Sequence, residues 1–185
     1  QLSMAQGIAL SMASGSLEFL QDGAWTKRMH PGWAAVAGFT AATLARHGFK
    51  GPRATYEGRF GVFNSYLGPL AKDCDLGLAT AGLGEVWELA KVTVKPLPAC
   101  HFTHACADAA AILRERHGLH VADIASVRSL VPAEVVKTVC EPVATKKRPQ
   151  NSYDAQFSIP YAVATALAKG RFGLAELDDA ALRDE

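Results

Sequence analysis

Three cationic or proton-carrying side chains crowd into four positions near the start of a predicted helix. Lys27, Arg28 and His30 stand immediately before Pro31, which suits a first helical turn because it has no N–H to lose. A helix N-terminus attracts anions through its unpaired N–H groups and its dipole. This corner therefore predicts a site for a carboxylate or phosphate group. The alternative interpretation is an exposed loop in which Lys27 and Arg28 are simply solvated.

A second group of such residues surrounds the start of a later predicted helix. Lys95 ends a short alternating stretch, and His101 and His104 follow a Pro-x-Pro segment. His104 and Asp108 are four residues apart and share one helix face, where a pair would orient the imidazole for acid–base chemistry. The alternative is a weak ion pair on the helix surface, and most lysines at strand ends are surface residues.

The same stretch raises the question of a metal site. Cys100, His101, His104 and Cys106 are close in sequence, but structural zinc sites use CxxC pairs or two separated clusters of ligands. Cys106 would lie across the helix from the adjacent Cys100 and His101. The sequence therefore predicts no metal site. The four cysteines form no CxxC pair, which indicates reduced thiols in a cytoplasmic protein.

A third candidate is the block "DAQFSIPY", which holds Asp154, Ser158 and Tyr161. A tyrosine in the first turn of a helix either presents its hydroxyl to a cleft or packs against its neighbours. The sequence has no GxSxG motif, no Walker loop and no GxGxxG placed between a strand and a helix. The chemistry that remains is acid–base catalysis without a bound cofactor.

Composition limits the classes of protein and partner. The chain has 185 residues, of which 49% are hydrophobic and 20% charged, as in globular chains with one domain or two small ones. A formal net charge of +1 gives no signature of nucleic-acid binding, and the run "TKKR" (145–148) predicts a solvated or carboxylate-facing loop. No apolar run reaches the roughly 20 residues that span a bilayer, so no membrane partner is expected.

The elements that must position these residues are mostly helices. Apolar spacing and punctuation predict two strands, at 91–95 and 126–132, and helices at 2–21, 31–48, 62–68, 83–90, 103–118, 133–139, 158–170 and within 171–185. The expected fold class is mixed. An all-α helical segment (1–90) is followed by a smaller α+β domain (91–185).

Four blocks in this order resemble the MmgE/PrpD family. They are "DGAWTKRMHPGWAAVAGFTAATLARHGFKGP", "EGRFG", "VKPLPACHFTHACADAA" and "DAQFSIPYAVATALAKG". The family includes 2-methylcitrate dehydratase, cis-aconitate decarboxylase and an iminodisuccinate epimerase. The resemblance implies a large all-helical domain, a smaller α+β lid, active sites between the two, a homodimer, and no required metal or cofactor. The chain resembles part of the helical domain and most of the lid, so we expect a partial chain.

The resemblance also assigns roles to residues. Lys27 and His30 fall on the family's "TK…H" motif, Lys95 on the lysine that opens the lid, and Tyr161 on the tyrosine of the "FS..Y" block. These four are the predicted catalytic residues. The predicted substrate-binding residues are Arg28, His101 and His104.

One departure bears on the specific reaction. In the decarboxylase branch a histidine lies five residues after the lid lysine, where this chain has Cys100 with His101 beside it. This difference argues against a decarboxylase.

The expected function is therefore a dehydratase (hydro-lyase) for a 2-methylcitrate-like hydroxy polycarboxylate. The family's reactions pass through a carbanion-like centre beside a carboxylate, which cations stabilise while a His or Tyr moves the proton. An epimerase of a dicarboxylic amino or imino acid is one alternative. A catalytically incomplete carboxylate-binding segment is the other.

Overall fold

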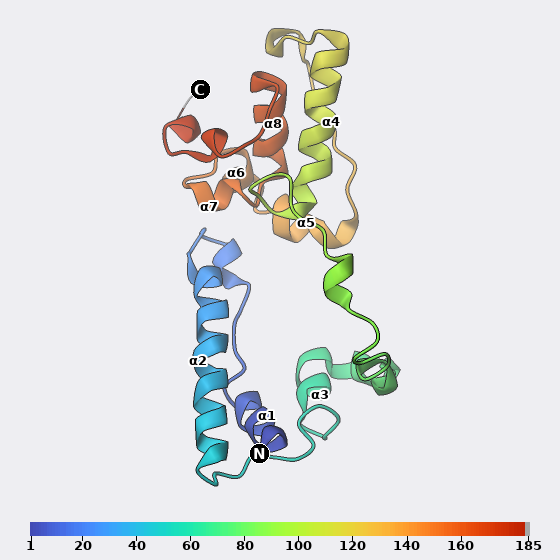
Figure 1. The fold of residues 1–185 in the computed structure, drawn as a ribbon. Coiled ribbons are helices and arrows are strands. Elements are labelled where there is room, and N and C mark those ends of the chain that lie inside the picture. Colours follow the sequence, from blue (N-terminus) through green and yellow to red (C-terminus); the bar gives the residue numbers. More distant parts are fainter. Residues whose placement is uncertain (184–185) are drawn as a thin grey trace. The chain divides into compact units, whose positions relative to one another are not determined.

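The chain divides into two compact units in the computed structural model, which describes residues 1–183. Unit 1 comprises residues 1–16 and 26–92, and unit 2 comprises 17–25 and 93–185. The ribbon of Figure 1 is coloured along the sequence and shows the helices of each unit.

Unit 1 is built on two helices that lie side by side, α1 (Leu2–Leu10) and α2 (Thr26–Arg46) (Figure 1). Ile8 of α1 packs on Ala41 and Ala45 of α2, and all three side chains are buried. Close approach is also needed at Gly7, where a Cβ atom would overlap the backbone of Pro52. The helix predicted at 2–21 is shorter than expected, because α1 ends at Leu10.

Helix α2 begins earlier than its sequence predicts. It starts at Thr26, so Pro31 lies inside the helix instead of in its first turn. Because proline has no N–H, the bond that the Lys27 carbonyl would accept four residues earlier is lost. The predicted end is confirmed: α2 stops at Arg46, and Gly48 takes a positive φ of 90°.

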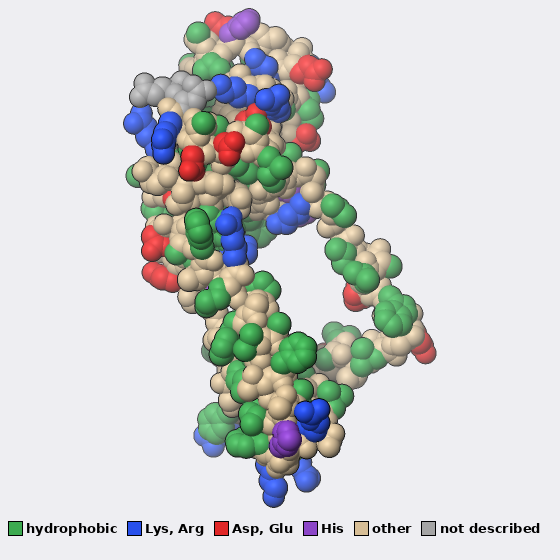
Figure 2. All heavy atoms as spheres, turned by 60° about the vertical axis from the view of Figure 1, so that its left-hand side comes forward, with side chains coloured by type: hydrophobic (Ala, Val, Ile, Leu, Met, Phe, Trp, Pro, Cys, Tyr) green, Lys and Arg blue, Asp and Glu red, His purple; other side chains and the backbone are tan. Residues whose placement is uncertain are grey.

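Much of the α2 surface is apolar and exposed. No charged residue occurs between Pro31 and Ala45, and α1 covers only one face of this stretch. Met29, Val36 and Phe39 are exposed, and Figure 2 shows apolar side chains spread over the surface of unit 1. A helix that is apolar on all sides is usually buried on all sides. Within the described part of unit 1, this face of α2 is uncovered.

The rest of unit 1 is short helices and turns. The predicted helix near 62–68 is confirmed as α3 (Val62–Leu67). The helix predicted at 83–90 is wrong, because only a 3₁₀ turn, Glu88–Lys91, forms there. Gly82 and Gly84 take positive φ angles of 71° and 85°, which interrupt a right-handed helix at its expected start.

Unit 2 is centred on α4 (His101–His117) and α8 (Ile159–Lys169), which lie side by side (Figure 1). Short side chains let the two helices approach closely, and the contact buries Ala107, Ala110, Ala162 and Ala166. Three shorter α-helices lie among the described residues of the unit: α5 (Ala133–Val139), α6 (Val143–Lys147) and α7 (Ser152–Ala155).

The ends of α8 are those that its sequence predicts. The Ser158 hydroxyl accepts a hydrogen bond from the Tyr161 N–H at 3.0 Å, Pro160 occupies the first turn, and Gly170 closes the helix in the left-handed conformation. Gly118 closes α4 in the same way. The start of α4 differs from the prediction, because Cys100 and not Thr103 is the N-cap residue.

The predicted strands are absent from the described residues 1–183, so the α+β lid is wrong and unit 2 is helical. Residues 92–95 and 124–132 are irregular and pair with no other segment in that range. Alternating apolar residues make a strand only where a second strand accepts the backbone hydrogen bonds. Val94 is 90% exposed, so the alternating pattern of residues 92–95 does not bury this apolar side chain. The described end of the chain forms two 3₁₀ turns, Ala175–Leu177 and Ala181–Arg183.

Candidate functional site

The start of α4 is held in place by the backbone that leads into it. Pro96 and Pro98 keep the preceding segment out of regular structure because neither has an N–H to donate. The Ala99 N–H donates to the Leu97 carbonyl at 2.9 Å, which forms a tight turn. The Cys100 N–H donates to the Gln156 carbonyl at 2.8 Å and so anchors α4 to the segment before α8. These bonds fix the position of the Ala99 carbonyl.

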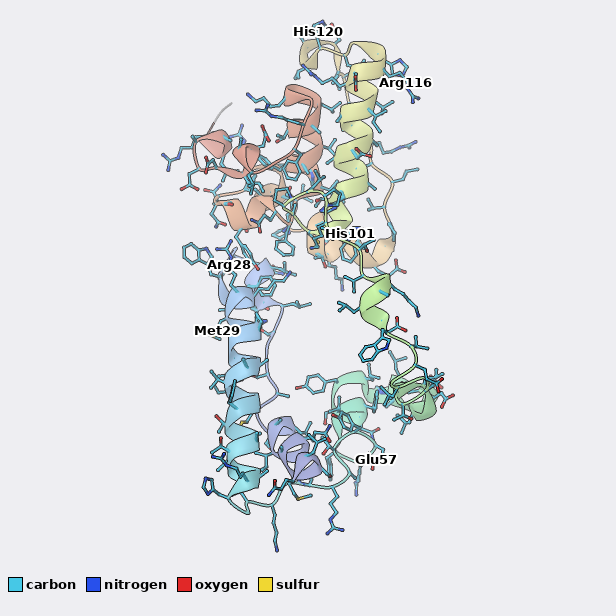
Figure 3. All side chains as sticks on the ribbon, in the orientation of Figure 1. Arg28, Met29, Glu57, His101, Arg116 and His120 are labelled. Carbon is cyan, nitrogen blue, oxygen red and sulfur yellow. The ribbon has the colours of Figure 1, made fainter. Side chains whose placement is uncertain are left out.

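Two predicted site residues converge on that carbonyl. The Lys95 ammonium donates to the Ala99 oxygen at 3.3 Å, and Nε2 of His104 lies at 3.3 Å from the same oxygen. The His101 ring stacks on the His104 ring with their centroids 4.9 Å apart. Figure 3 shows His101 at the N-terminal end of α4. We call Lys95, the Ala99 carbonyl, His101 and His104 the α4 N-terminal site.

Histidine 104 is the buried member of this site, with a side chain only 7% exposed. Burial lowers its pKa below 6.5, and the positive charges of His101 and Lys95 act in the same direction, while the backbone carbonyls of Ala99 and Leu97 oppose that shift. His104 is therefore neutral at pH 7. The predicted pair with Asp108 does not form within the described residues, where the His104 ring binds the backbone through Nε2.

The protonation pattern of the His104 ring follows from its partner. A carbonyl oxygen only accepts hydrogen bonds, so the ring nitrogen that binds Ala99, Nε2, carries the proton. In a neutral imidazole the other nitrogen, Nδ1, then holds a lone pair. Nδ1 is buried and has no hydrogen-bond partner in the described part of the chain. The site therefore contains an unprotonated nitrogen that nothing in the described structure satisfies.

The first turn of α4 adds positive potential to the site. No side chain caps this 17-residue helix, since Cys100 at the N-cap makes no side-chain bond to it. Free N–H groups and the helix dipole favour an anion at such an end. With the Lys95 ammonium nearby, the arrangement suits a carboxylate group.

Tyr161 lies in the first turn of α8 and its hydroxyl has a structural partner. The hydroxyl donates to the backbone carbonyl of Glu176 at 2.5 Å, and its ring packs edge-on against Phe172. Of the two alternatives that its position allowed, the packed one describes this structure. Its role in proton transfer stays a prediction.

Lys27, Arg28 and His30 belong to unit 1, where they lie in the first turns of α2 and not in a preceding loop. Figure 3 shows Arg28 at this end of α2. The segment after α1 runs along the same end of the helix: the His30 ring lies against Gly15, and the indole N–H of Trp33 donates to a backbone carbonyl at 3.1 Å. The functional roles of these three residues stay predictions.

Sequence reasoning missed a buried cation in unit 2. Lys146, from the run predicted to be solvated, is only 1% exposed. Burial lowers the pKa of its ammonium group, and the negative charge of Asp154 and the thiols of Cys100 and Cys140 oppose that shift. The Ser158 hydroxyl also donates to the Lys146 carbonyl. Nothing in the sequence of the three adjacent cations, Lys146, Lys147 and Arg148, indicates that one of them is buried.

Neither a metal centre nor a membrane helix is evident in the described residues. No three His, Cys, Asp or Glu side chains among residues 1–183 converge as metal ligands, so the set around Cys100 and Cys106 gains no support. No helix within that range is both long and apolar enough to cross a bilayer. The predicted homodimer and cytoplasmic location stay predictions.

Comparison with known families agrees with the four sequence blocks. The MmgE/PrpD N-terminal domain matches residues 1–74, and the MmgE/PrpD C-terminal domain matches residues 97–185. The second match contains the whole of α4, with His101 and His104, and Tyr161 of α8. No curated protein matches the chain. The two family matches follow each other in order along most of the sequence, and the chain belongs to the MmgE/PrpD family.

Proposed function

We propose that the chain is a dehydratase (hydro-lyase) of the MmgE/PrpD type that acts on a 2-methylcitrate-like hydroxy polycarboxylate. The observation that supports this function best is the convergence of Lys95 and His104 on the Ala99 carbonyl, with His101 stacked beside them. One cation, two imidazoles and an uncapped helix end are the groups that carboxylate chemistry requires. Family membership makes a reaction of this kind the first to consider.

The chemistry follows from the charges at the α4 N-terminal site. Removing a proton beside a carboxylate places negative charge on that carboxylate as an enolate develops. The Lys95 ammonium and the first-turn N–H groups of α4 stabilise this charge. A neutral imidazole then serves as the proton acceptor, which is the ordinary role of histidine near neutral pH.

Lys27 and His30 enter the proposal through the family motif alone, since both lie in unit 1. A substrate with two or three carboxylates has more negative charge than Lys95 by itself neutralises. We propose that these two residues also act on the substrate, and their substitution tests that part separately.

Two alternatives use the same carboxylate-binding chemistry. An epimerase of a dicarboxylic amino or imino acid exchanges its α-proton with solvent and loses no water. A catalytically incomplete segment binds the carboxylate and changes nothing. The departure at Cys100 argues against decarboxylation as a third outcome.

The deciding experiment separates these reactions by their products. The purified chain is incubated in D₂O with 2-methylcitrate, citrate, cis-aconitate and a dicarboxylic amino acid, and the mixture is followed by NMR. We expect loss of water from 2-methylcitrate. Proton exchange without loss of water would replace the dehydratase by the epimerase, and loss of CO₂ from cis-aconitate would contradict both.

Matched variants then test the residues. Lys95→Ala should reduce the rate by about 100-fold or more, because it removes a charge that stabilises the enolate. Lys91→Ala, which removes an exposed lysine paired with Glu88, should leave the rate unchanged. Lys27→Ala tests the contribution of α2. Equal rates for Lys95→Ala and Lys91→Ala would refute the assignment of the site.

A further inference from the structure

We propose that His104 is the catalytic base of this site and takes the substrate proton through Nδ1. This inference rests on the proposed function and assigns proton abstraction to a residue outside the predicted catalytic set. Its basis is the geometry of the ring. Nε2 faces the Ala99 carbonyl at 3.3 Å, while the buried Nδ1 has no partner within residues 1–183.

An unsatisfied buried nitrogen requires an explanation. A polar atom that is removed from water without a hydrogen bond costs free energy, so such atoms are rare in folded proteins. His104 is only 7% exposed, and its Nδ1 has no hydrogen-bond partner within the described residues. A ligand that brings a proton to Nδ1 removes this cost on binding.

The neighbouring groups favour His104 over the other candidates. The Tyr161 hydroxyl donates its proton to the Glu176 carbonyl, and Lys95 serves the site as a cation. Of Lys95, His104 and Tyr161, His104 alone combines a fixed ring with a ring nitrogen that has no hydrogen-bond partner within residues 1–183. Burial lowers the pKa of His104, and the charges of Lys95 and His101 act in the same direction, so the ring stays unprotonated at neutral pH.

The orientation of the His104 ring involves His101. The exposed His101 side chain stacks on one face of the His104 ring with the two planes inclined by 20°. The lone pair of Nδ1 lies in the plane of the His104 ring, so the stack holds the ring in its orientation without covering the lone pair. His101 is then a positioning residue, and His104 is the residue that contacts the proton.

The elimination balances when His104 carries the proton. The substrate C–H bond breaks, its proton forms an N–H bond at Nδ1, and its electron pair forms the new C=C bond. That electron pair passes through the enolate that Lys95 stabilises, and the C–O bond to the neighbouring hydroxyl group breaks as the C=C bond forms. The His104 imidazolium then returns the proton to the departing hydroxide, which leaves as water, and the neutral ring is restored.

Two isosteric variants test the assignment. The side-chain amide of His104→Gln places a donor near the position of Nε2 and so keeps the bond to Ala99, but it has no group at Nδ1. His104→Asn places an amide near Nδ1 and loses the Ala99 bond. His117→Gln, at the exposed C-terminal end of the same helix, is the matched control.

With 2-methylcitrate in D₂O, we expect His104→Gln to lose about 100-fold or more in kcat, with KM changed much less, because it lacks only the proton acceptor. His117→Gln should match the natural chain. If the natural chain eliminates water and His104→Gln does so equally fast, the inference fails and the proposed function stands. If the natural chain neither eliminates water nor exchanges the proton, the proposed function fails, and the assignment of His104 as its base fails with it.

A second measurement does not depend on activity. The ¹⁵N NMR shifts of the His104 ring at pH 7.5 report which nitrogen carries the proton. We expect a neutral ring protonated at Nε2, and a shift of Nδ1 toward the protonated state when tricarballylate, a tricarboxylate without a hydroxyl group, is added below pH 6. A ring protonated at Nδ1 in the free chain would overturn the inference whatever the activity. Folding of each variant is checked by circular dichroism before either measurement.

Discussion

The strongest prediction about stability concerns Glu176, which joins three backbone segments of unit 2. Glu176 is 6% exposed, and its carboxylate accepts hydrogen bonds from Nε of Arg171 at 2.7 Å and from the Gly173 N–H at 2.8 Å. Its own carbonyl accepts the Tyr161 hydroxyl. The Arg171 hydrogen bond, foremost, holds the pKa of Glu176 below its usual value.

The size of the effect follows from these bonds. Glu176→Ala leaves the half-buried Gly173 N–H without its acceptor, which costs about 1–3 kcal/mol. Arg171 is 73% exposed and recovers its hydration, so the broken ion pair adds little. We expect a loss of about 2 kcal/mol for Glu176→Ala, and about 1 kcal/mol for Glu176→Gln, whose amide oxygen still accepts from Gly173.

The pH dependence gives a further check. A carboxyl group with a depressed folded pKa stabilises the fold above its unfolded pKa, close to 4.5, and that contribution is lost as the pH falls through the folded pKa. The difference between the natural chain and Glu176→Gln should therefore shrink between pH 5 and the most acidic pH at which the chain remains folded.

Urea unfolding followed by circular dichroism measures both effects at pH 7 and near pH 3. Arg171→Ala is the matched variant and should cost less than Glu176→Ala. The reasoning is refuted if Arg171→Ala destabilises the chain more than Glu176→Ala does. It is also refuted if both Glu176 variants unfold at the midpoint of the natural chain at pH 7.

Three other predictions use the same unfolding measurement. Ser158→Ala removes the N-cap bond to the Tyr161 N–H and the donor to the Lys146 carbonyl, and should cost about 1–2 kcal/mol, whereas exposed Ser126→Ala should cost nothing measurable. Gly7→Ala should destabilise unit 1, because the added Cβ overlaps the Pro52 backbone. This overlap should outweigh the preference of about 1 kcal/mol that alanine has over glycine in a helix, and a stabilised variant would contradict this packing. Burial lowers the pKa of His104 below 6.5, so below that pH the unfolded chain binds more protons at this residue than the folded chain does, and the free energy of unfolding should decrease on acidification. His104→Gln should make the free energy of unfolding depend less on pH. An unchanged pH dependence would exclude His104 as its source.

Local signals in the sequence predict both ends of α8 and the C-terminal end of α4. Ser158, Pro160 and Gly170 mark the ends of α8, and Gly118 marks the end of α4, because caps and breakers act within a few residues of themselves. The strands failed for the opposite reason. The alternation around Val92 and Val94 predicts which residues share a face. A strand also requires backbone hydrogen bonds to a second segment, which can be distant in the sequence.

The candidate site shows the same division between local and distant information. Spacing placed His101 and His104 at the start of one helix, and the structure brings Lys95 to the same carbonyl. The preference of His104 for the backbone over Asp108 depends on the Pro-rich turn before α4, which spacing on a helix does not describe. The burial of Lys146 depends on the packing of α6 against α8, and its sequence neighbours, Lys147 and Arg148, indicate solvent instead.

The most direct test of the central claim is the binding of a carboxylate at the α4 N-terminal site. Tricarballylate is titrated into the ¹⁵N-labelled chain, and the shifts of the His101 and Phe102 amides and of the His104 ring are followed by NMR. We expect saturable shifts at these residues. Lys95→Ala should weaken binding by about 10-fold or more, because a charged hydrogen bond contributes roughly 1.5–3 kcal/mol, while Lys91→Ala should bind as the natural chain does. Absence of shifts at the start of α4, or equal affinities for Lys95→Ala and Lys91→Ala, would contradict the account.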